Sequence, residues 1–320
     1  MNYKFFCVLL LFMLGIFSIQ ESACEAQVAF FQGAELYLGS GYRSGELDWN
    51  IAGDSSGSNP DVLSELEWKE LDIFQTKADG QVWFGSAKWP NVSLCIKGSA
   101  AYGWVIDGNN RDSDYAGDHR TLEFSRSENN GEGGNLLDLS IAAGPQFKLL
   151  QGKLAIALLA GWSYHEQNLE ISDGQQTIAA DPNDLGPFPG LDSSYDTKWW
   201  GPWLGTDLNW QVNERVSLSG AFAWHFANYE AKADWNLRDD LAHPVSFRHY
   251  ADGYGLTLGL GLEYQLSSTW LLKLSYDYQN WQADDGSSYS YAASGGSGRT
   301  RLNEVNWRSH SALLSLGYQF

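Results

Sequence analysis

The chain has 320 residues, and 20 Lys and Arg against 39 Asp and Glu give it a formal net charge of -19 at pH 7. This excess of negative charge argues against nucleic acid as a partner, because the phosphate backbone is itself anionic. A mean hydropathy of -0.33 leaves no room for a bundle of membrane-spanning helices, each of which needs about 20 apolar residues in a row. The composition therefore excludes a helical membrane protein and disfavours a nucleic-acid-binding one.

The first 26 residues have the pattern of a secretory signal peptide. Lys4 precedes an unbroken apolar stretch, residues 5–19, and mostly small and polar residues follow up to Ala26. We expect cleavage after Ala26, with lipid attachment at Cys24 as the alternative. Cleavage after Ala26 leaves Cys95 as the one cysteine of the mature chain, so no intramolecular disulfide is expected.

Alternating hydrophobicity dominates the rest of the chain and indicates β-strands. In the C-terminal segment, 311–320, apolar side chains occupy every second position, and most of the others are small or polar. Segments 256–264 and 270–278 show the same alternation on either side of a short turn, as expected of a hairpin. Segments of about ten residues with an apolar outer face, a polar inner face and aromatic ends are typical of a transmembrane β-barrel.

Two features favour a barrel over a soluble β-sandwich, whose strands would alternate in the same way. The expected connections alternate between short ones and long ones rich in Gly and Asp, as when one barrel end faces the periplasm and the other the cell exterior. In addition, the chain ends on Phe320, in a sequence Ser-Leu-Gly-Tyr-Gln-Phe that resembles the C-terminal assembly signal of bacterial outer-membrane proteins. We therefore predict a barrel.

The prediction is one domain, residues 27–320, that forms an all-β, ten-stranded antiparallel transmembrane β-barrel with short periplasmic turns and five long extracellular loops. An even strand number, as single-chain barrels of this kind have, places both termini at the periplasmic end. Several strands exceed the ~9 to 11 residues that cross a bilayer, so the barrel should project beyond the membrane. The expected strands are 34–43, 64–86, 92–107, 134–149, 153–170, 196–211, 216–235, 246–265, 270–285 and 303–320, and the expected loops are 44–63, 108–133, 171–195, 236–245 and 286–302.

Function should lie at the outer mouth, because a ten-stranded barrel is too narrow for a generous aqueous pore. The second expected loop carries Asp112 and Asp114, which project to the same side of an extended segment. One interpretation of these residues is a solvated acidic turn. Another is a calcium-binding loop that also uses Asp107 and Asn109, although the spacing is not that of an EF-hand.

Two segments resemble a known family, the omptins, which are outer-membrane endopeptidases built on a ten-stranded barrel. Residues 64–69, Ser-Glu-Leu-Glu-Trp-Lys, look like the family's second-strand Ser-Gln-Leu-Asp-Trp-Lys, and residues 108–115 look like its Gly-Asn-x-x-Asp-x-Asp-Trp motif, with Tyr115 in place of Trp. The resemblance implies that Asp112 and Asp114 face an Asp-x-His pair across a cleft and that the two pairs activate a water. Neighbouring carboxylates raise each other's pKa, and a histidine is a suitable general base, so this chemistry is physically sensible.

The second pair of that implied site is incomplete in this sequence. Asp234 matches the family's Asp, but Asn236 stands where the His should be, and an amide cannot serve as a general base. His119, His243 and His249 are alternative bases without the Asp-x-His spacing. We therefore predict a surface-exposed binding or adhesion scaffold whose catalysis is lost. The alternative is an aspartic-type endopeptidase that cleaves peptides next to basic residues.

The same resemblance implies where the protein works. We expect a monomer in the outer membrane of a Gram-negative-type cell, in contact with membrane lipid. Lipopolysaccharide is the expected environment and the one possible requirement for activity, since omptins need it; no other cofactor is expected. The strongly negative charge would attract cationic peptides or proteins.

Several aromatic residues and histidines outside these motifs receive structural interpretations. His225 is interpreted as a hydrogen-bonding residue of the lumen and His310 as a residue at the membrane interface. Amphipathic rings favour the boundary of a bilayer. The aromatic cluster of residues 195–203 is therefore interpreted as an interfacial girdle, or as a carbohydrate platform. Its members are Tyr195, Trp199, Trp200 and Trp203.

Overall fold

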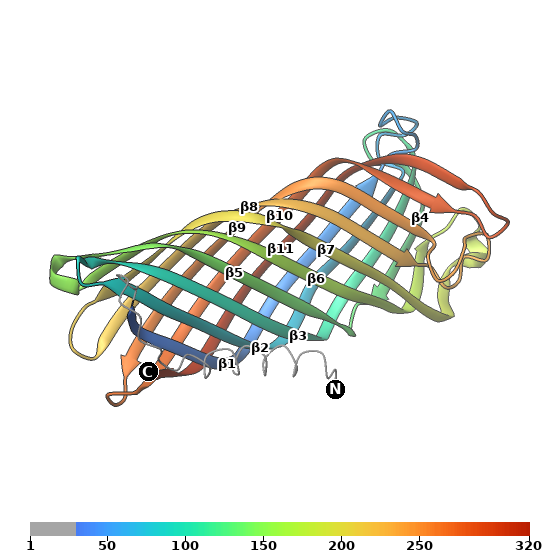
Figure 1. Ribbon diagram of the computed structural model, residues 1–320. Helices are drawn as coiled ribbons and strands as arrows, with labels where there is room; N and C mark the ends of the chain where they lie inside the picture. The colour runs from blue at the N-terminus through green and yellow to red at the C-terminus, as the bar shows by residue number, and fades with distance from the viewer. Residues whose placement is uncertain (1–29) are drawn as a thin grey trace.

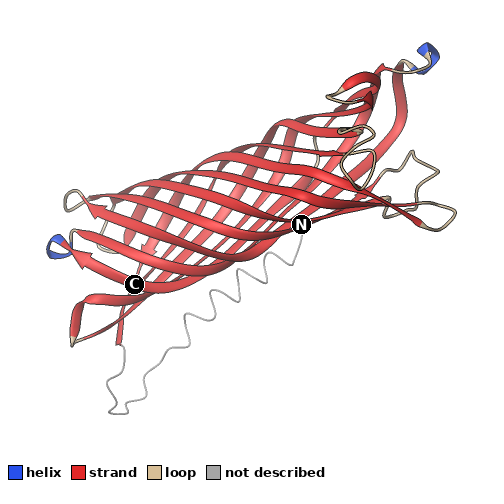
Figure 2. Cartoon of the chain, turned by 90° about the horizontal axis from the view of Figure 1, so that it is seen from above, coloured by secondary structure: helices blue, strands red, loops and turns tan. Residues whose placement is uncertain are grey.

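The computed structural model describes residues 30–320, so the expected signal peptide lies outside the described residues. Residues 30–320 form a closed, tilted antiparallel β-barrel (Figures 1 and 2). Short connections and the C-terminus lie at one end, which we call the turn end, and the longer connections lie at the other, the loop end (Figure 1). No helix in this part of the chain is long and apolar enough to cross a membrane.

The ring has ten members, as predicted, although the described chain contains eleven strands. β4 pairs with the loop-end parts of β3 and β6, and β5 pairs with the turn-end parts of the same two strands, so β4 and β5 share one place in the ring. Contact between β2 and β3 closes the barrel. The bounds are β1 (Phe30–Ile51), β2 (Ser64–Ser86), β3 (Trp89–Gly117), β4 (Thr121–Asn130), β5 (Gly134–Leu149), β6 (Leu154–Ile178), β7 (Gly186–Gln211), β8 (Val216–Asp234), β9 (Phe247–Gln265), β10 (Trp270–Tyr291) and β11 (Ser297–Gln319).

The strands run further toward the loop end than the sequence predicts. The expected loop 108–133 is a hairpin instead, in which β3 continues to Gly117 and β4 returns from Thr121. The expected loops 44–63, 171–195 and 286–302 shorten to 52–63, 179–185 and 292–296. The predicted loop bounds were wrong because polar sequence was taken as a sign of a loop. That inference holds only where a strand must have one apolar face. A strand of mostly polar residues also satisfies its backbone through cross-strand hydrogen bonds.

The half of the wall toward the turn end carries apolar side chains on its outer face, and we call it the belt zone. Leu38, Ile141 and Leu260 are among its large side chains and are 43 %, 57 % and 65 % exposed, which is the outer surface expected where strands meet lipid. Aromatic side chains at its two edges include Trp104, Trp162, Trp210, Trp224, Trp270 and Phe320. The alternation predicted for a membrane barrel is therefore confirmed in this zone.

The half toward the loop end, the loop zone, has the opposite arrangement. Its interior is filled by a cluster of buried apolar side chains that we call the loop-end core, whereas its outer face bears charged pairs such as Arg308 with Glu46 and Arg248 with Glu230. The expectation of a polar inner face is wrong for this zone. The largest fully buried members of the loop-end core are Trp68, Trp199, Trp281, Trp307, Tyr195 and Tyr229.

The interpretation of Tyr195, Trp199 and Trp203 as an interfacial girdle is also wrong. These three side chains are at most 5 % exposed and face the barrel interior. The residues that alternate with them, Asp196 and Lys198, point outward, and Asp196 pairs with Lys232 at 3.0 Å, which suits a surface exposed to water. His225 is a hydrogen-bonding lumen residue, as predicted: its Nδ1 lies 2.9 Å from Ser163 Oγ.

Candidate functional site

Asp112 and Asp114 lie on β3, near the loop end, and not in a loop. Their cross-strand partners on β2 are Leu66 and Ser64, and Leu66 is fully buried in the loop-end core. Residues two apart on a strand share a face, as the spacing predicts. The pairing of Asp112 with buried Leu66 shows that this face is the inner one, so both carboxyl groups point to the inside of the mouth.

The two carboxyl groups interact with each other in a poorly solvated position. Burial is the main cause that raises the pKa of Asp112, and the charge of Asp114 raises it further; burial likewise raises the pKa of Asp114. Asp112 Oδ1 is buried and has no hydrogen-bond partner. The pair therefore holds a proton more readily than two solvated aspartates, and one of its oxygens can still accept a hydrogen bond.

Two side chains that act on the pair, Trp235 and Arg238, belong to the connection between β8 and β9. The Trp235 side chain hydrogen-bonds Asp112, and the charge of Arg238 acts on both carboxyl groups and favours their ionised forms. Asp240 holds the Arg238 guanidinium through two contacts of 2.8 Å. The mouth thus presents two carboxyl groups opposite an indole and a guanidinium.

Closely packed aromatic rings lie beneath this mouth. Trp235 meets Phe247 with ring centroids 4.7 Å apart, and Trp49 lies 5.7 Å from both Phe247 and Tyr195. Trp49 and Tyr195 belong to the loop-end core, so the floor of the mouth is continuous with that core.

His249 lies within this floor and cannot act at the aspartate pair. It is fully buried, its Nδ1 lies 2.8 Å from Tyr195 Oη, and the Trp49 ring covers it at 4.8 Å between centroids. Burial lowers the pKa of His249 to about 3, so the imidazole stays neutral. It is a packing residue of the floor.

Asp234 does not face the aspartate pair, although it matches the implied family position. Ala231 and Ala233 on β8 point into the barrel and are 1 % exposed, so Asp234 shares the opposite face of the strand with Lys232 and Glu230. The inward position next to the aspartate pair is taken by Trp235, which sequence reasoning missed.

Asp234 nevertheless has a histidine partner. His243 Nδ1 lies 2.6 Å from Asp234 Oδ1, and this hydrogen bond raises the pKa of His243. The two residues are nine positions apart, so the Asp-x-His pattern could not reveal them. The fold of the β8–β9 connection alone makes this pair.

Asn236 and His119 have structural roles. Asn236 Oδ1 accepts from the Asp192 amide and from Ser193 Oγ, at 2.9 and 3.0 Å, and its Nδ2 donates to the Gly190 carbonyl at 2.7 Å. These bonds tie the end of β8 to the beginning of β7. His119 lies at the tip of the β3–β4 hairpin, where its ring contacts Asp61 at 3.1 Å and its side chain is 90 % exposed.

The described residues contain no group of three or more His, Cys, Asp or Glu side chains that could hold a metal ion. The calcium interpretation required Asn109 and Asp112 to converge, but they lie on opposite faces of β3, and Asn109 Nδ2 instead donates to Glu70 Oε2 at 3.0 Å. The extended conformation of β3 therefore separates the expected ligands.

Comparison with known proteins links the chain to outer-membrane barrels. Residues 37–320 match the family described as Pom: Protochlamydia outer membrane protein. No curated protein matches the chain. Among solved structures, the outer membrane protease OmpT from Escherichia coli superposes with a TM-score of 0.73 at 14 % identity, over 92 % of this chain and 99 % of OmpT.

A second solved structure, the attachment invasion locus protein Ail of Yersinia pestis, matches with a TM-score of only 0.29 at 10 % identity, over 90 % of this chain and 100 % of Ail. The likeness to OmpT shows a shared fold, that of a ring of ten antiparallel strands.

Proposed function

Because the chain belongs to the Protochlamydia outer membrane protein family, and is thus an outer-membrane β-barrel protein, we propose that it acts as a surface-exposed binding scaffold. In this proposal the loop end faces the cell exterior, and the turn end, with both termini, faces the periplasm. The contrast between the two zones supports this orientation, since an outer face bearing charged pairs suits water and an apolar outer face suits lipid.

The observation that carries the proposal is the identity of the groups around Asp112 and Asp114. A general base has to lie within hydrogen-bond reach of the water that it deprotonates, directly or through one further water. Trp235 contacts the aspartate pair, and the charge of Arg238 acts on it. Of the candidate bases, His249 is fully buried in the floor, and His119 forms its contact with Asp61. This arrangement supports binding without catalysis.

The ligand that suits this mouth is a cationic side chain of a peptide or protein. Two carboxyl groups beside an aromatic floor attract a guanidinium or ammonium group, because carboxylates offer charge-assisted hydrogen bonds and ring faces attract cations. The net charge of -19 favours the approach of such ligands. A bound cation would displace the proton that the pair holds.

A peptidase is the second candidate, and one specific observation favours it. The Asp234–His243 pair, at 2.6 Å, supplies a carboxylate-oriented imidazole at the same end of the barrel as Asp112 and Asp114. OmpT, which shares the fold, is named as a protease. In this alternative, movement of the β8–β9 connection would have to bring His243 to the aspartate pair.

The experiment uses a quenched fluorescent peptide that contains Arg-Arg, with the full-length mature barrel refolded in the presence of lipopolysaccharide. Binding is measured by anisotropy and cleavage by fluorescence increase, for the wild type, the double variant Asp112→Asn, Asp114→Asn, and His243→Ala. Asp184→Asn, in the connection between β6 and β7, is the matched control for loss of negative charge. Loss of the heat-dependent mobility shift typical of a folded barrel would identify a variant that fails to fold.

We expect binding without cleavage, with affinity reduced at least tenfold in the double variant and unchanged in Asp184→Asn. Cleavage by the wild type that disappears in His243→Ala would establish the peptidase instead. Equal binding by the wild type and the folded double variant would refute the mouth as the binding site. Monomeric state and contact with lipopolysaccharide stay predictions.

A further inference from the structure

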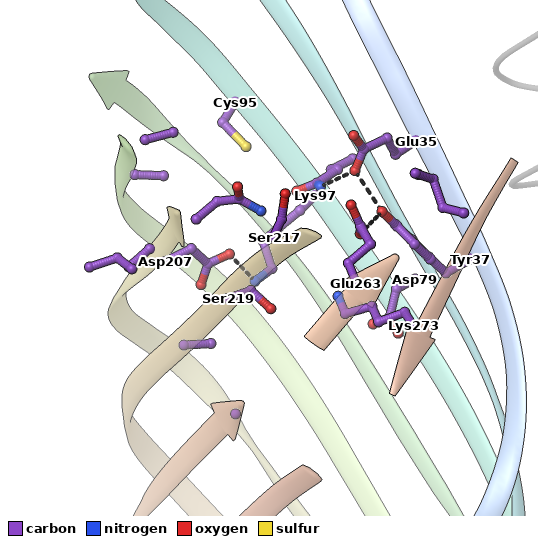
Figure 3. Close-up of a pocket in the computed structure, with 18 of the residues that line it drawn as sticks. Glu35, Tyr37, Asp79, Cys95, Lys97, Asp207, Ser217, Ser219, Glu263 and Lys273 are labelled. Carbon is purple, nitrogen blue, oxygen red and sulfur yellow. Dashed lines mark hydrogen bonds and ion pairs between the residues drawn. The ribbon is translucent and has the colours of Figure 1, made fainter. Parts of the chain in front are cut away.

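A second polar region lies inside the barrel at the turn end, at the opposite end of the barrel from the mouth. It is a cavity of about 550 Å³, shown in Figure 3, and side chains from both halves of the sequence line it. None of its lining residues belongs to the loop-end core, and Gly152, Gln211, Gln265 and Gln319 place it at the ends of the strands. We call it the turn-end cavity.

Most charged groups of the turn-end cavity neutralise each other across the lumen. Lys97 Nζ lies 2.5 Å from Asp207 Oδ2, and Lys77 Nζ lies 3.0 Å from Asp277 Oδ2 (Figure 3 shows the first pair). These lysines therefore already have partners, as charged groups in a low-dielectric interior require.

One corner of the cavity departs from this rule. Glu35 on β1 and Glu263 on β9 both hydrogen-bond the hydroxyl group of Tyr37, which lies between them (Figure 3). Tyr37 is 3 % exposed and has one hydroxyl proton, so it can donate to only one of the two carboxylates. Gln81 Nε2 donates to Glu35 Oε2 at 2.8 Å but brings no charge.

Within residues 30–320, no Lys or Arg forms an ion pair with Glu35 or Glu263. Lys273 is nearby, but its Nζ lies over the Tyr37 ring, 4.8 Å from the centroid. Two carboxylates that share one donated proton in an enclosed lumen need a further proton or a cation. The corner holds two carboxylates and one cation, Lys273, whose charge acts on Glu35, so it is one positive charge short.

The wall next to this corner has a different character. Trp83 follows Gln81 on β2 by two residues and so shares its inward face, and Trp83, Cys95 and Ala157 add an apolar surface to the cavity lining. Gln32 also lines the cavity, and its Oε1 is buried and has no hydrogen-bond partner. Unused hydrogen-bonding capacity beside an apolar wall is characteristic of small-molecule sites.

We propose that the turn-end cavity binds a small organic ammonium ion with an apolar body. The ammonium group donates hydrogen bonds to Glu35 and Glu263 and supplies the missing positive charge. The apolar body lies against Trp83 and Ala157. A volume of about 550 Å³ accommodates a ligand of this class together with water. The site is separate from the mouth, so it does not depend on the function proposed above.

The test compares two probes of matched size, 2-phenylethylamine, which is cationic at neutral pH, and 2-phenylethanol, which is neutral. Saturable binding to the full-length mature barrel in detergent is measured by ligand-observed NMR. Glu263→Gln and Glu35→Gln remove one charge each, and Glu132→Gln, in the short link between β4 and β5, is the control for net charge.

We expect the amine to bind the wild type at least tenfold more tightly than the alcohol. Each cavity variant should weaken amine binding at least tenfold, and Glu132→Gln should leave it unchanged. Equal affinities of the two probes for the wild type, or full amine affinity in a folded Glu263→Gln or Glu35→Gln, would overturn the proposal. The comparison of the two probes decides the question even where a cavity variant does not fold.

Discussion

The belt zone and the loop zone share the same strands but carry their large apolar side chains on opposite faces of them. On β1, Leu38 and Tyr42 point outward and are 43 % and 65 % exposed, whereas Leu47 and Trp49 point inward and are at most 3 % exposed. Pairing with β11 continues without a shift from Leu38 to Trp49, so the backbone alternation is unbroken. The sequence itself changes phase between these positions.

The same change of phase occurs on β8. Phe222 and Phe226 face outward in the belt zone, whereas Tyr229 and Ala231 face inward in the loop zone. Lipid covers an apolar outer face and leaves the lumen polar, whereas water outside the barrel requires the apolar residues to be within. The loop zone is thus built like a water-soluble barrel that continues a membrane one.

The largest difference should appear when the same kind of substitution, Leu to Ala, is made once in each zone. Leu47→Ala removes a fully buried side chain from the loop-end core and should lower the free energy of unfolding by about 3–5 kcal/mol, since a cavity adds to the transfer cost. Leu260→Ala, in the belt zone, leaves no cavity because lipid fills the space, and should cost about 1–2 kcal/mol. Urea unfolding in phospholipid vesicles measures both, and equal costs would break the comparison.

A charge on the outer face should distinguish the zones next. Leu260→Arg places a charge where lipid is expected and should cost about 2–4 kcal/mol. Glu46→Gln, on the outer face of the loop zone, removes a charge that is exposed to water and should change the free energy of unfolding by at most about 0.5 kcal/mol. Tolerance of Arg at position 260 in the same unfolding assay would show that the belt zone does not face lipid.

Asp112 and Asp114 are ionisable groups at the edge of an otherwise apolar interior, and they should make the loop zone pH-sensitive. Because their pKa values are raised in the folded chain, the folded state retains a proton that the unfolded state loses as pH rises above the usual aspartate range. Stability should therefore fall as pH rises, until the folded pair is also ionised. Asp112→Asn should flatten this dependence in unfolding titrations from pH 4 to 9.

The affinity of the mouth for a cationic peptide should change in the opposite direction. Binding favours the ionised pair, so affinity should rise with pH over the same interval, and calorimetry in buffers of different ionisation enthalpy should detect proton release. Affinity that is independent of pH would contradict the inferred protonation of the pair.

No effect on activity is expected from restoring the implied family residue. Asn236→His should produce no peptide cleavage, because position 236 is directed toward Gly190, Asp192 and Ser193 and not toward the aspartate pair. It should lower the free energy of unfolding by about 1 kcal/mol through the lost hydrogen bonds. Cleavage of the Arg-Arg peptide by this variant would show that the β8–β9 connection can rearrange.

Much of the site was accessible to sequence reasoning, and the missing part has a definite cause. Spacing alone predicts that Asp112 and Asp114 share a strand face, which β3 confirms. It could not identify Trp235 or the partner of Asp234, because these depend on which face of β8 is turned inward and on how the following connection folds back. The alternation of Tyr229, Ala231 and Ala233 carries that information, but only once the loop zone is known to be apolar inside.

The sequence by itself determined the class of fold, since alternation over ten segments, short turns and an aromatic terminus describe an outer-membrane barrel whatever its contacts. Only the tertiary structure decided which side of each strand is buried near the loop end, because that depends on whether lipid or water surrounds the wall. It also decided that Glu35, Tyr37 and Glu263 meet, since β1 and β9 become neighbours across the lumen only when the ring closes.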